Sequence, residues 1–199
     1  MGGNVIMMIN GHGFGPDYIV DSGVVLIVLI PLFLAILVRQ ISKKRVTFFR
    51  ISGLIMFFIY IYALIKVTIF PMMIFKFGSK AYRYGFGKQY LANFNVLEIS
   101  KYTPIQIWGN IALILPLSIL IAYLWPHKLS AFKFNICVGI LTTIGIEMTQ
   151  LIMAFFYLGS RTFDINDLIL NLLGYLLGFC IYKVIKPIFN IESDMFRVF

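Results

Sequence analysis

Long apolar stretches separated by short basic segments are the feature that most constrains what this chain can fold into. A bilayer core of about 30 Å needs roughly 20 apolar residues for each helical crossing, and about five stretches here meet that length. With 60% hydrophobic and 13% charged residues, the chain also has too little polar surface to clothe a water-soluble globule. We therefore predict an all-α fold, a polytopic integral membrane helix bundle.

The expected crossings lie near residues 18–38, 51–75, 104–125, 134–156 and 165–189, within one transmembrane domain over 18–189. Residues 1–17 lack the basic and apolar regions of a cleaved secretory signal, so we expect the first crossing to be retained. Residues 76–103 form a loop in which aromatic and basic residues alternate. Such a segment suits the lipid headgroup layer, and ligand contact is the alternative.

The basic residues lie at the ends of apolar segments, so the net charge of +9 does not indicate a nucleic-acid partner. Under the positive-inside rule the bias favours an extracytoplasmic stretch at 1–17 and a cytoplasmic tail at 190–199. Ten of the 17 Lys and Arg would then face the cytoplasm: Arg39, Lys43, Lys44, Arg45, Arg50, Lys128, Lys133, Lys183, Lys186 and Arg197. We predict a multi-pass membrane protein with its N-terminus outside and membrane lipids as partners.

Neither the cysteines nor the histidines suggest a metal or cofactor. Cys137 and Cys180 fall inside apolar segments, where a thiol usually behaves as a small hydrophobe. His12 and His127 are predicted on opposite sides of the membrane, so they cannot share a metal ion. We expect no cofactor and no metal.

Polar residues inside the crossings are the most informative ones, because an ionisable group in lipid costs at least about 2.5 kcal/mol. Glu147 and Gln150 share a helical face with small residues, and Gly174 and Gly178 on the last crossing permit close helix packing. The expected polar pocket, descending from the outer surface, consists of Asn110, Glu147, Gln150, Arg161, Asp164, Asp167 and Asn171. Blander roles remain open: Asp164 and Asp167 could cap a helix, and the amides could simply join helices.

Lys66 is a possible ion-pair partner of Glu147. When residues are counted from the outer ends of their helices, at about 1.5 Å each, the two side chains reach a similar depth. An ion pair would remove two unpaired charges from the membrane interior.

Three blocks occur in a fixed order: the Asn and Pro of residues 109–117, then E-x-x-Q, then R-x-x-D-x-x-D-x-x-x-N-x-x-G. In these blocks the chain resembles the VanZ-like family of bacterial membrane proteins. The similarity covers roughly residues 62–182. Two features depart from the family: residues 95–99 read Asn-Val-Leu-Glu-Ile where a proline-containing string is common, and Lys66 is not typical.

The resemblance implies an association with resistance to the lipophilic glycopeptide antibiotic teicoplanin. Combined with the polar residues, it leads us to expect a bacterial cell-envelope protein whose outward-facing pocket binds an envelope lipid, a lipid-linked precursor or a glycopeptide. The alternatives are a membrane enzyme with Glu147 and Asp167 as acid and base, and a small transporter. The sequence lacks a nucleophile–base pair and a nucleotide loop, which favours the non-enzymatic reading.

Overall fold

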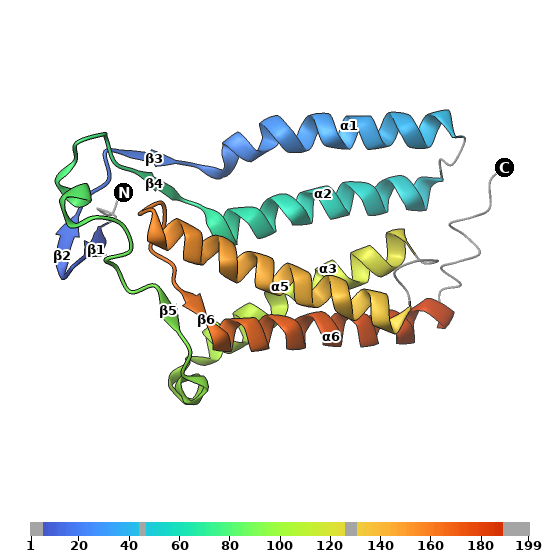
Figure 1. The fold of residues 1–199 in the computed structure, drawn as a ribbon. Coiled ribbons are helices and arrows are strands. Elements are labelled where there is room, and N and C mark those ends of the chain that lie inside the picture. The colour runs from blue at the N-terminus through green and yellow to red at the C-terminus, as the bar shows by residue number, and fades with distance from the viewer. Residues whose placement is uncertain (1–5, 44–46, 126–130, 189–199) are drawn as a thin grey trace.

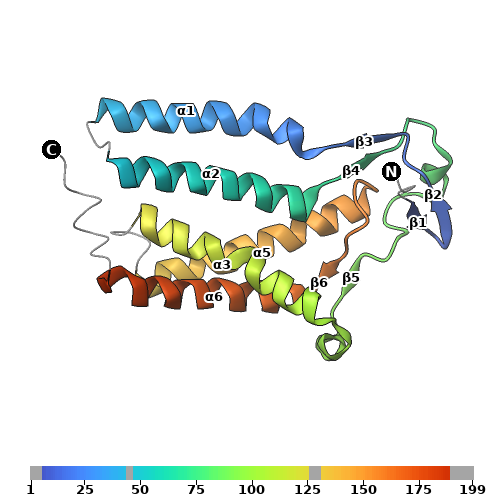
Figure 2. The same ribbon diagram turned by 180° about the vertical axis from the view of Figure 1, so that it is seen from behind.

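Long helices lie side by side in the computed structural model, which describes residues 6–43, 47–125 and 131–188 (Figures 1 and 2). In this described part of the chain, five helices are long and apolar enough to cross a membrane. They are α1 (Leu26–Ser42, entered through the 3-10 turn η1, Ser22–Val25), α2 (Phe48–Ile69), α3 (Pro104–Leu124), α5 (Phe132–Phe155) and α6 (Ile165–Ile188). The all-α, five-helix prediction is confirmed.

The first two helices are shifted relative to the expected crossings at 18–38 and 51–75. Residues Tyr18–Val20 form strand β3, and α2 ends at Ile69, after which Met72–Ile74 form strand β4. Pro71 explains the early end, because it has no backbone N–H and the residue before a proline disfavours helix. The two strands pair antiparallel, with Tyr18 opposite Ile74. Residue 189 of the expected fifth crossing and the tail at 190–199 lie outside the described residues.

Helix starts are fixed by local hydrogen bonds. The Thr47 side chain accepts the backbone N–H of Arg50 at the start of α2, at 3.3 Å. At the start of α3, Gln106 accepts the backbone N–H of Thr103 at 2.8 Å, and Pro104 occupies the first helical position. Both arrangements satisfy N–H groups that the helix itself leaves unpaired.

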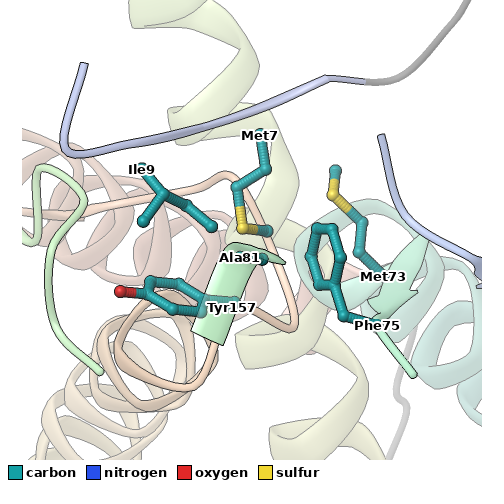
Figure 3. Close-up of a cluster of buried hydrophobic side chains, with 6 residues drawn as sticks. All are labelled: Met7, Ile9, Met73, Phe75, Ala81 and Tyr157. Atoms are coloured by element: carbon teal, nitrogen blue, oxygen red, sulfur yellow. The ribbon is translucent and has the colours of Figure 1, made fainter. Parts of the chain in front are cut away.

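The segments at one end of the bundle fold into a small cap. Strands β1 (Met7–Ile9) and β2 (His12–Phe14) form a hairpin, and the 3-10 helix η2 (Lys80–Tyr84) packs near it. Figure 3 shows the buried side chains that join them: Met7, Ile9, Met73, Phe75, Ala81 and Tyr157. Part of the 76–103 loop is thus folded onto the hairpin rather than lying open, while its basic side chains, Lys76, Lys80, Arg83 and Lys88, are exposed.

The helices are not equally embedded in the bundle. None of the residues of α1 is buried, and its apolar side chains face outward or towards α2. In contrast, α6 lies directly against α3, where a Cβ at Gly174 would overlap the backbone carbonyl of Ile111. A Cβ at Gly178 would likewise overlap Leu115 and Ser118 of α3. These glycines lie where the two helix backbones come closest.

Candidate functional site

The candidate site is built around a segment that turns back into the bundle. Glu147 lies eight residues, or about 12 Å of helix, before the end of α5 at Phe155. Its carboxylate nevertheless accepts the backbone N–H of Asp164, at the start of α6, at 3.0 Å. The chain after α5 therefore runs back alongside that helix through strand β6 (Phe163–Asp164) before α6 begins (Figures 1 and 2).

This turn changes the expected depths. Counting along the sequence placed Asp167 near the outer surface and Glu147 about 13 Å below that surface, assuming that each helix starts at the surface. The hydrogen bond to Asp164 instead puts Glu147 level with the first turn of α6. Asn110, Glu147, Asp164 and Asp167 thus form one layer across the bundle rather than a descent, with Glu147 only 1% exposed.

Asp164 is the centre of this layer. One carboxylate oxygen accepts the backbone N–H of Asn166 at 2.8 Å and its side-chain N–H at 3.0 Å. The first of these bonds caps α6, which begins at the next residue, Ile165. The other oxygen accepts from the Asn93 amide at 3.0 Å. Capping is therefore part of the role of Asp164, as the blander reading of the sequence allowed.

The loop before α3 supplies the other side of the layer. Strand β5 (Ala92–Asn93) pairs in parallel with β6, which sets Asn93 opposite Asp164. The buried Asn93 amide also donates to Glu98 at 2.9 Å. Asn166, which is fully buried, donates to the backbone carbonyl of Asn95 at 3.0 Å.

Asp167 connects the first turn of α6 to α3. It accepts a hydrogen bond from the Asn110 amide, and it also lies beside the Tyr102 hydroxyl. Burial raises the pKa of Tyr102 above its ordinary value, and the adjacent carboxylates of Asp164 and Asp167 raise it further. A phenol beside two carboxylates thus keeps its proton.

Gln150 and Arg161 line a cavity of about 260 Å³ next to this layer, between the C-terminal ends of α2 and α5. The Gln150 amide donates to the backbone carbonyl of Thr68 on α2 at 3.1 Å. The exposed Arg161 forms no salt bridge with any residue that the structure describes, although Glu147 and Asp167 attract its guanidinium from a longer distance. The rest of the wall is largely apolar, with Ile69, Phe70, Met73 and Met153.

The expected ion pair between Lys66 and Glu147 is not formed. Lys66 is exposed on α2, and the only salt bridge among the described residues joins Lys101 and Glu98. The similar depths came from counting along each helix, which does not say towards which neighbour a side chain points. Glu147 has the Asp164 backbone N–H as its partner instead.

The structure brings Asn110, Glu147, Asp164 and Asp167 into one network, with Gln150 and Arg161 beside it. Asn171 is buried one turn further along α6, and its side-chain oxygen has no hydrogen-bond partner among the described residues. Sequence reasoning missed Asn93, Tyr102 and Asn166. Asn166 stands inside the R-x-x-D-x-x-D motif and could have been included, but nothing local marked Asn93 or Tyr102.

Four carboxylates contribute to or flank the network, yet they do not form a metal centre. Within the described part of the chain, no three His, Cys, Asp or Glu side chains are arranged to hold a metal ion. Asp164, Glu98 and Asp167 instead accept hydrogen bonds from the amides of Asn93, Asn166 and Asn110. The arrangement joins the loop, α3, α5 and α6.

Comparison with known proteins identifies the family. The model of the VanZ/LLP1 family matches residues 57–186, well over half of the chain, and this range includes the whole polar layer and the Arg161 cavity. No curated protein and no solved structure matches significantly. With its membrane-spanning helices and this match, the chain belongs to the VanZ/LLP1 family.

Proposed function

We propose that this VanZ-family protein binds the phosphate-bearing headgroup of an envelope lipid or lipid-linked precursor in the cavity between the outer ends of α2 and α5. The observation that carries the proposal is the Arg161 guanidinium, which lines this cavity without a salt bridge from the described residues. A guanidinium can bind a phosphate through two parallel hydrogen bonds. The amide of Gln150, on the same wall, adds a polar group that can orient the headgroup.

The size and walls of the cavity support a headgroup rather than a whole lipid. About 260 Å³ is slightly below the range of roughly 300–1,000 Å³ that drug-sized ligands occupy. The apolar side chains of Phe70, Met73 and Met153 surround the polar groups. Such a wall suits a ligand with an anionic head and an adjoining lipid tail.

The orientation of the chain is part of the proposal. The end of α1, the start of α2, the end of α3, the start of α5 and the C-terminal end of α6 lie at the end of the bundle opposite the cap (Figure 1). The positive-inside bias assigns this end to the cytoplasm. The cavity and the cap would then face outward, on the side where lipid-linked envelope precursors are used and where glycopeptides act.

An acid–base enzyme has less support from the geometry. Glu147 is 1% exposed and already hydrogen-bonded to the Asp164 backbone, so a substrate could reach it only after the turn had moved. A transporter would need an opening through the same buried layer. Binding requires no such movement, because Arg161 is already exposed.

Lipid co-purification tests the proposal. Wild-type protein and the Arg161→Gln variant are purified in mild detergent, and bound lipids are identified by mass spectrometry. The matched control, Arg83→Gln, removes the same charge from the cap, away from this cavity. We expect a phosphate-bearing lipid with wild type and Arg83→Gln and a large loss with Arg161→Gln; equal retention by both variants would contradict the proposal.

The physiological consequence is tested in cells. If a bound envelope precursor reduces the access of lipophilic glycopeptides, expression of the wild-type chain should lower teicoplanin susceptibility and Arg161→Gln should abolish that effect. Equal membrane levels of the two proteins are checked by immunoblot. If Arg161→Gln lowers teicoplanin susceptibility as much as wild type does, the effect does not depend on this cavity.

A further inference from the structure

A second hollow, of about 430 Å³, lies at the end of the bundle opposite the cap. It is formed by the last turn of α1, the first turns of α2 and the end of α3. Its polar lining consists of Arg39, Gln40, Lys43 and Arg50, and Leu124 and Trp125 are part of its apolar wall. This hollow shares no lining residue with the Arg161 cavity and does not depend on the proposed function.

The charge at this hollow is one-sided. Arg39 of α1, Lys43 just after it and Arg50 of α2 line it, and none of the acids that the structure describes is among its lining residues. The acids in the described part of the chain lie far from the hollow: Asp17, Asp21, Glu98, Asp164 and Asp167 lie in the cap or at the helix ends beside it, and Glu147 lies in the half of α5 nearer the cap. Glu192 and Asp194 lie outside the described residues. An anion from the surroundings would lower the repulsion between Arg39 and Lys43.

The position and the walls indicate which anion this is. The hollow is at the end of three helices that are long and apolar enough to span a membrane. Helices of this length match the thickness of the hydrocarbon core, so their ends are expected at the headgroup boundary. Trp125, 38% exposed at its rim, is of the residue type that favours this boundary. Basic pockets between membrane helices are typical sites for anionic headgroups, and the apolar wall can accept the start of an acyl chain.

We propose that this hollow binds the phosphodiester headgroup of an anionic membrane lipid through Arg39 and Lys43. It is a second lipid site, on the opposite face of the membrane from the Arg161 cavity. Its ligand is a bulk anionic phospholipid such as phosphatidylglycerol, selected by charge and by depth in the bilayer. Free inorganic phosphate carries the same chemical group but would not use the apolar wall.

Tryptophan fluorescence can report this site directly. The chain has two tryptophans, so Trp108→Phe leaves Trp125 as the only indole, at the rim of the hollow. The protein is placed in vesicles containing brominated phosphatidylglycerol or, separately, brominated phosphatidylcholine at the same mole fraction. We expect the anionic lipid to quench Trp125 more strongly, and equal quenching by the two lipids would overturn the proposal.

Charge-matched variants show which cations cause the stronger quenching of Trp125 by the anionic lipid, called here the preference. In the Trp108→Phe background, Arg39→Gln with Lys43→Gln should weaken the preference by at least about tenfold, because it removes the two charge-assisted contacts with the headgroup. Lys133→Gln with Lys183→Gln removes two charges from the same end of the bundle but outside the hollow, and should preserve it. An equal loss in both double variants would show a general surface effect and overturn the proposal.

Three further measurements keep the result decisive. Arg39→Lys with Lys43→Arg retains both charges, so a folded variant of this kind should keep the preference. Inorganic phosphate that abolishes the preference at constant ionic strength would show an anion site rather than a lipid site. A preference that appears only in Glu192→Gln with Asp194→Asn would show that the chain's own acids fill the hollow, which also overturns the proposal.

Discussion

Replacing Gly174 by alanine should force α3 and α6 apart. A Cβ at this position would overlap the carbonyl oxygen of Ile111 and lie 2.8 and 2.9 Å from its carbonyl carbon and Cα. These atoms belong to the helix backbone, so they cannot turn away as a flexible side chain would. Overpacking a core typically costs about 1–3 kcal/mol, and contact with backbone places Gly174→Ala near the upper value.

The expected effect can be measured as a melting temperature. For a protein of this size, about 3 kcal/mol corresponds to a decrease of roughly 6–12 °C. Gly145→Ala is the matched control, since Gly145 is exposed on α5 and a Cβ there meets nothing within 4 Å. Alanine also favours helix over glycine, so the control should melt at the wild-type temperature or slightly above it.

Circular dichroism in detergent would follow the loss of helix in both variants. If Gly174→Ala and Gly145→Ala melt at the same temperature, the close approach of α3 and α6 is not present in the folded protein. The same reasoning applies to Gly178→Ala, whose Cβ would overlap Leu115 and Ser118.

Three other outcomes follow from the structure. Lys66→Met should change the free energy of unfolding by less than about 0.5 kcal/mol, because Lys66 is exposed and is not paired with Glu147. A larger loss of stability, measured by thermal unfolding, would support the ion pair that the sequence suggested. In a protein whose native cysteines are replaced, a cysteine introduced at Ser160 should react with a membrane-impermeant maleimide on intact cells, and one introduced at Ser42 should not. The reverse labelling pattern would show the opposite orientation in the membrane. The pKa of Tyr102 is raised in the folded protein, so its contribution to stability is present below about pH 10 and is lost as the pH rises towards the folded pKa. The difference in melting temperature between wild type and Tyr102→Phe should therefore shrink from about pH 9 to about pH 11.

The helices could be predicted from the sequence because the requirement of the bilayer is local. A crossing needs a fixed length of apolar residues, and that length can be counted. The buried face of α5 could be predicted for a similar reason. Gly139, Thr143, Glu147 and Gln150 recur at helical spacing, and all four are buried in the structure.

The geometry of the site could not be predicted because it depends on long-range contacts. Counting depth along each helix assumes that every helix begins at the same level, whereas α6 begins beside Glu147, well below the end of α5. Asn93 reaches Asp164 across 71 positions of sequence, through the pairing of two short strands. No local pattern marks such a partner, and the same limitation produced the wrong pairing for Lys66.

The role of Glu147 can be separated from that of Arg161, because the hydrogen bond between Glu147 and Asp164 holds the turn that carries the arginine. Arg161 precedes Asp164 by only three residues, so losing this bond should also displace the guanidinium from the cavity. Glu147→Gln keeps an oxygen that can accept the Asp164 N–H, whereas Glu147→Met leaves this N–H without an acceptor, at a cost of about 1–3 kcal/mol.

Glu147→Gln should therefore retain the co-purifying lipid, and Glu147→Met should lose both stability and lipid. Arg161→Gln should lose the lipid while its melting temperature stays close to wild type, since the exposed arginine forms no salt bridge with the described residues. A stable Glu147→Gln protein that binds no lipid would contradict this assignment. The carboxylate charge itself would then act on the ligand, and Glu147 would be more than the residue that positions the turn.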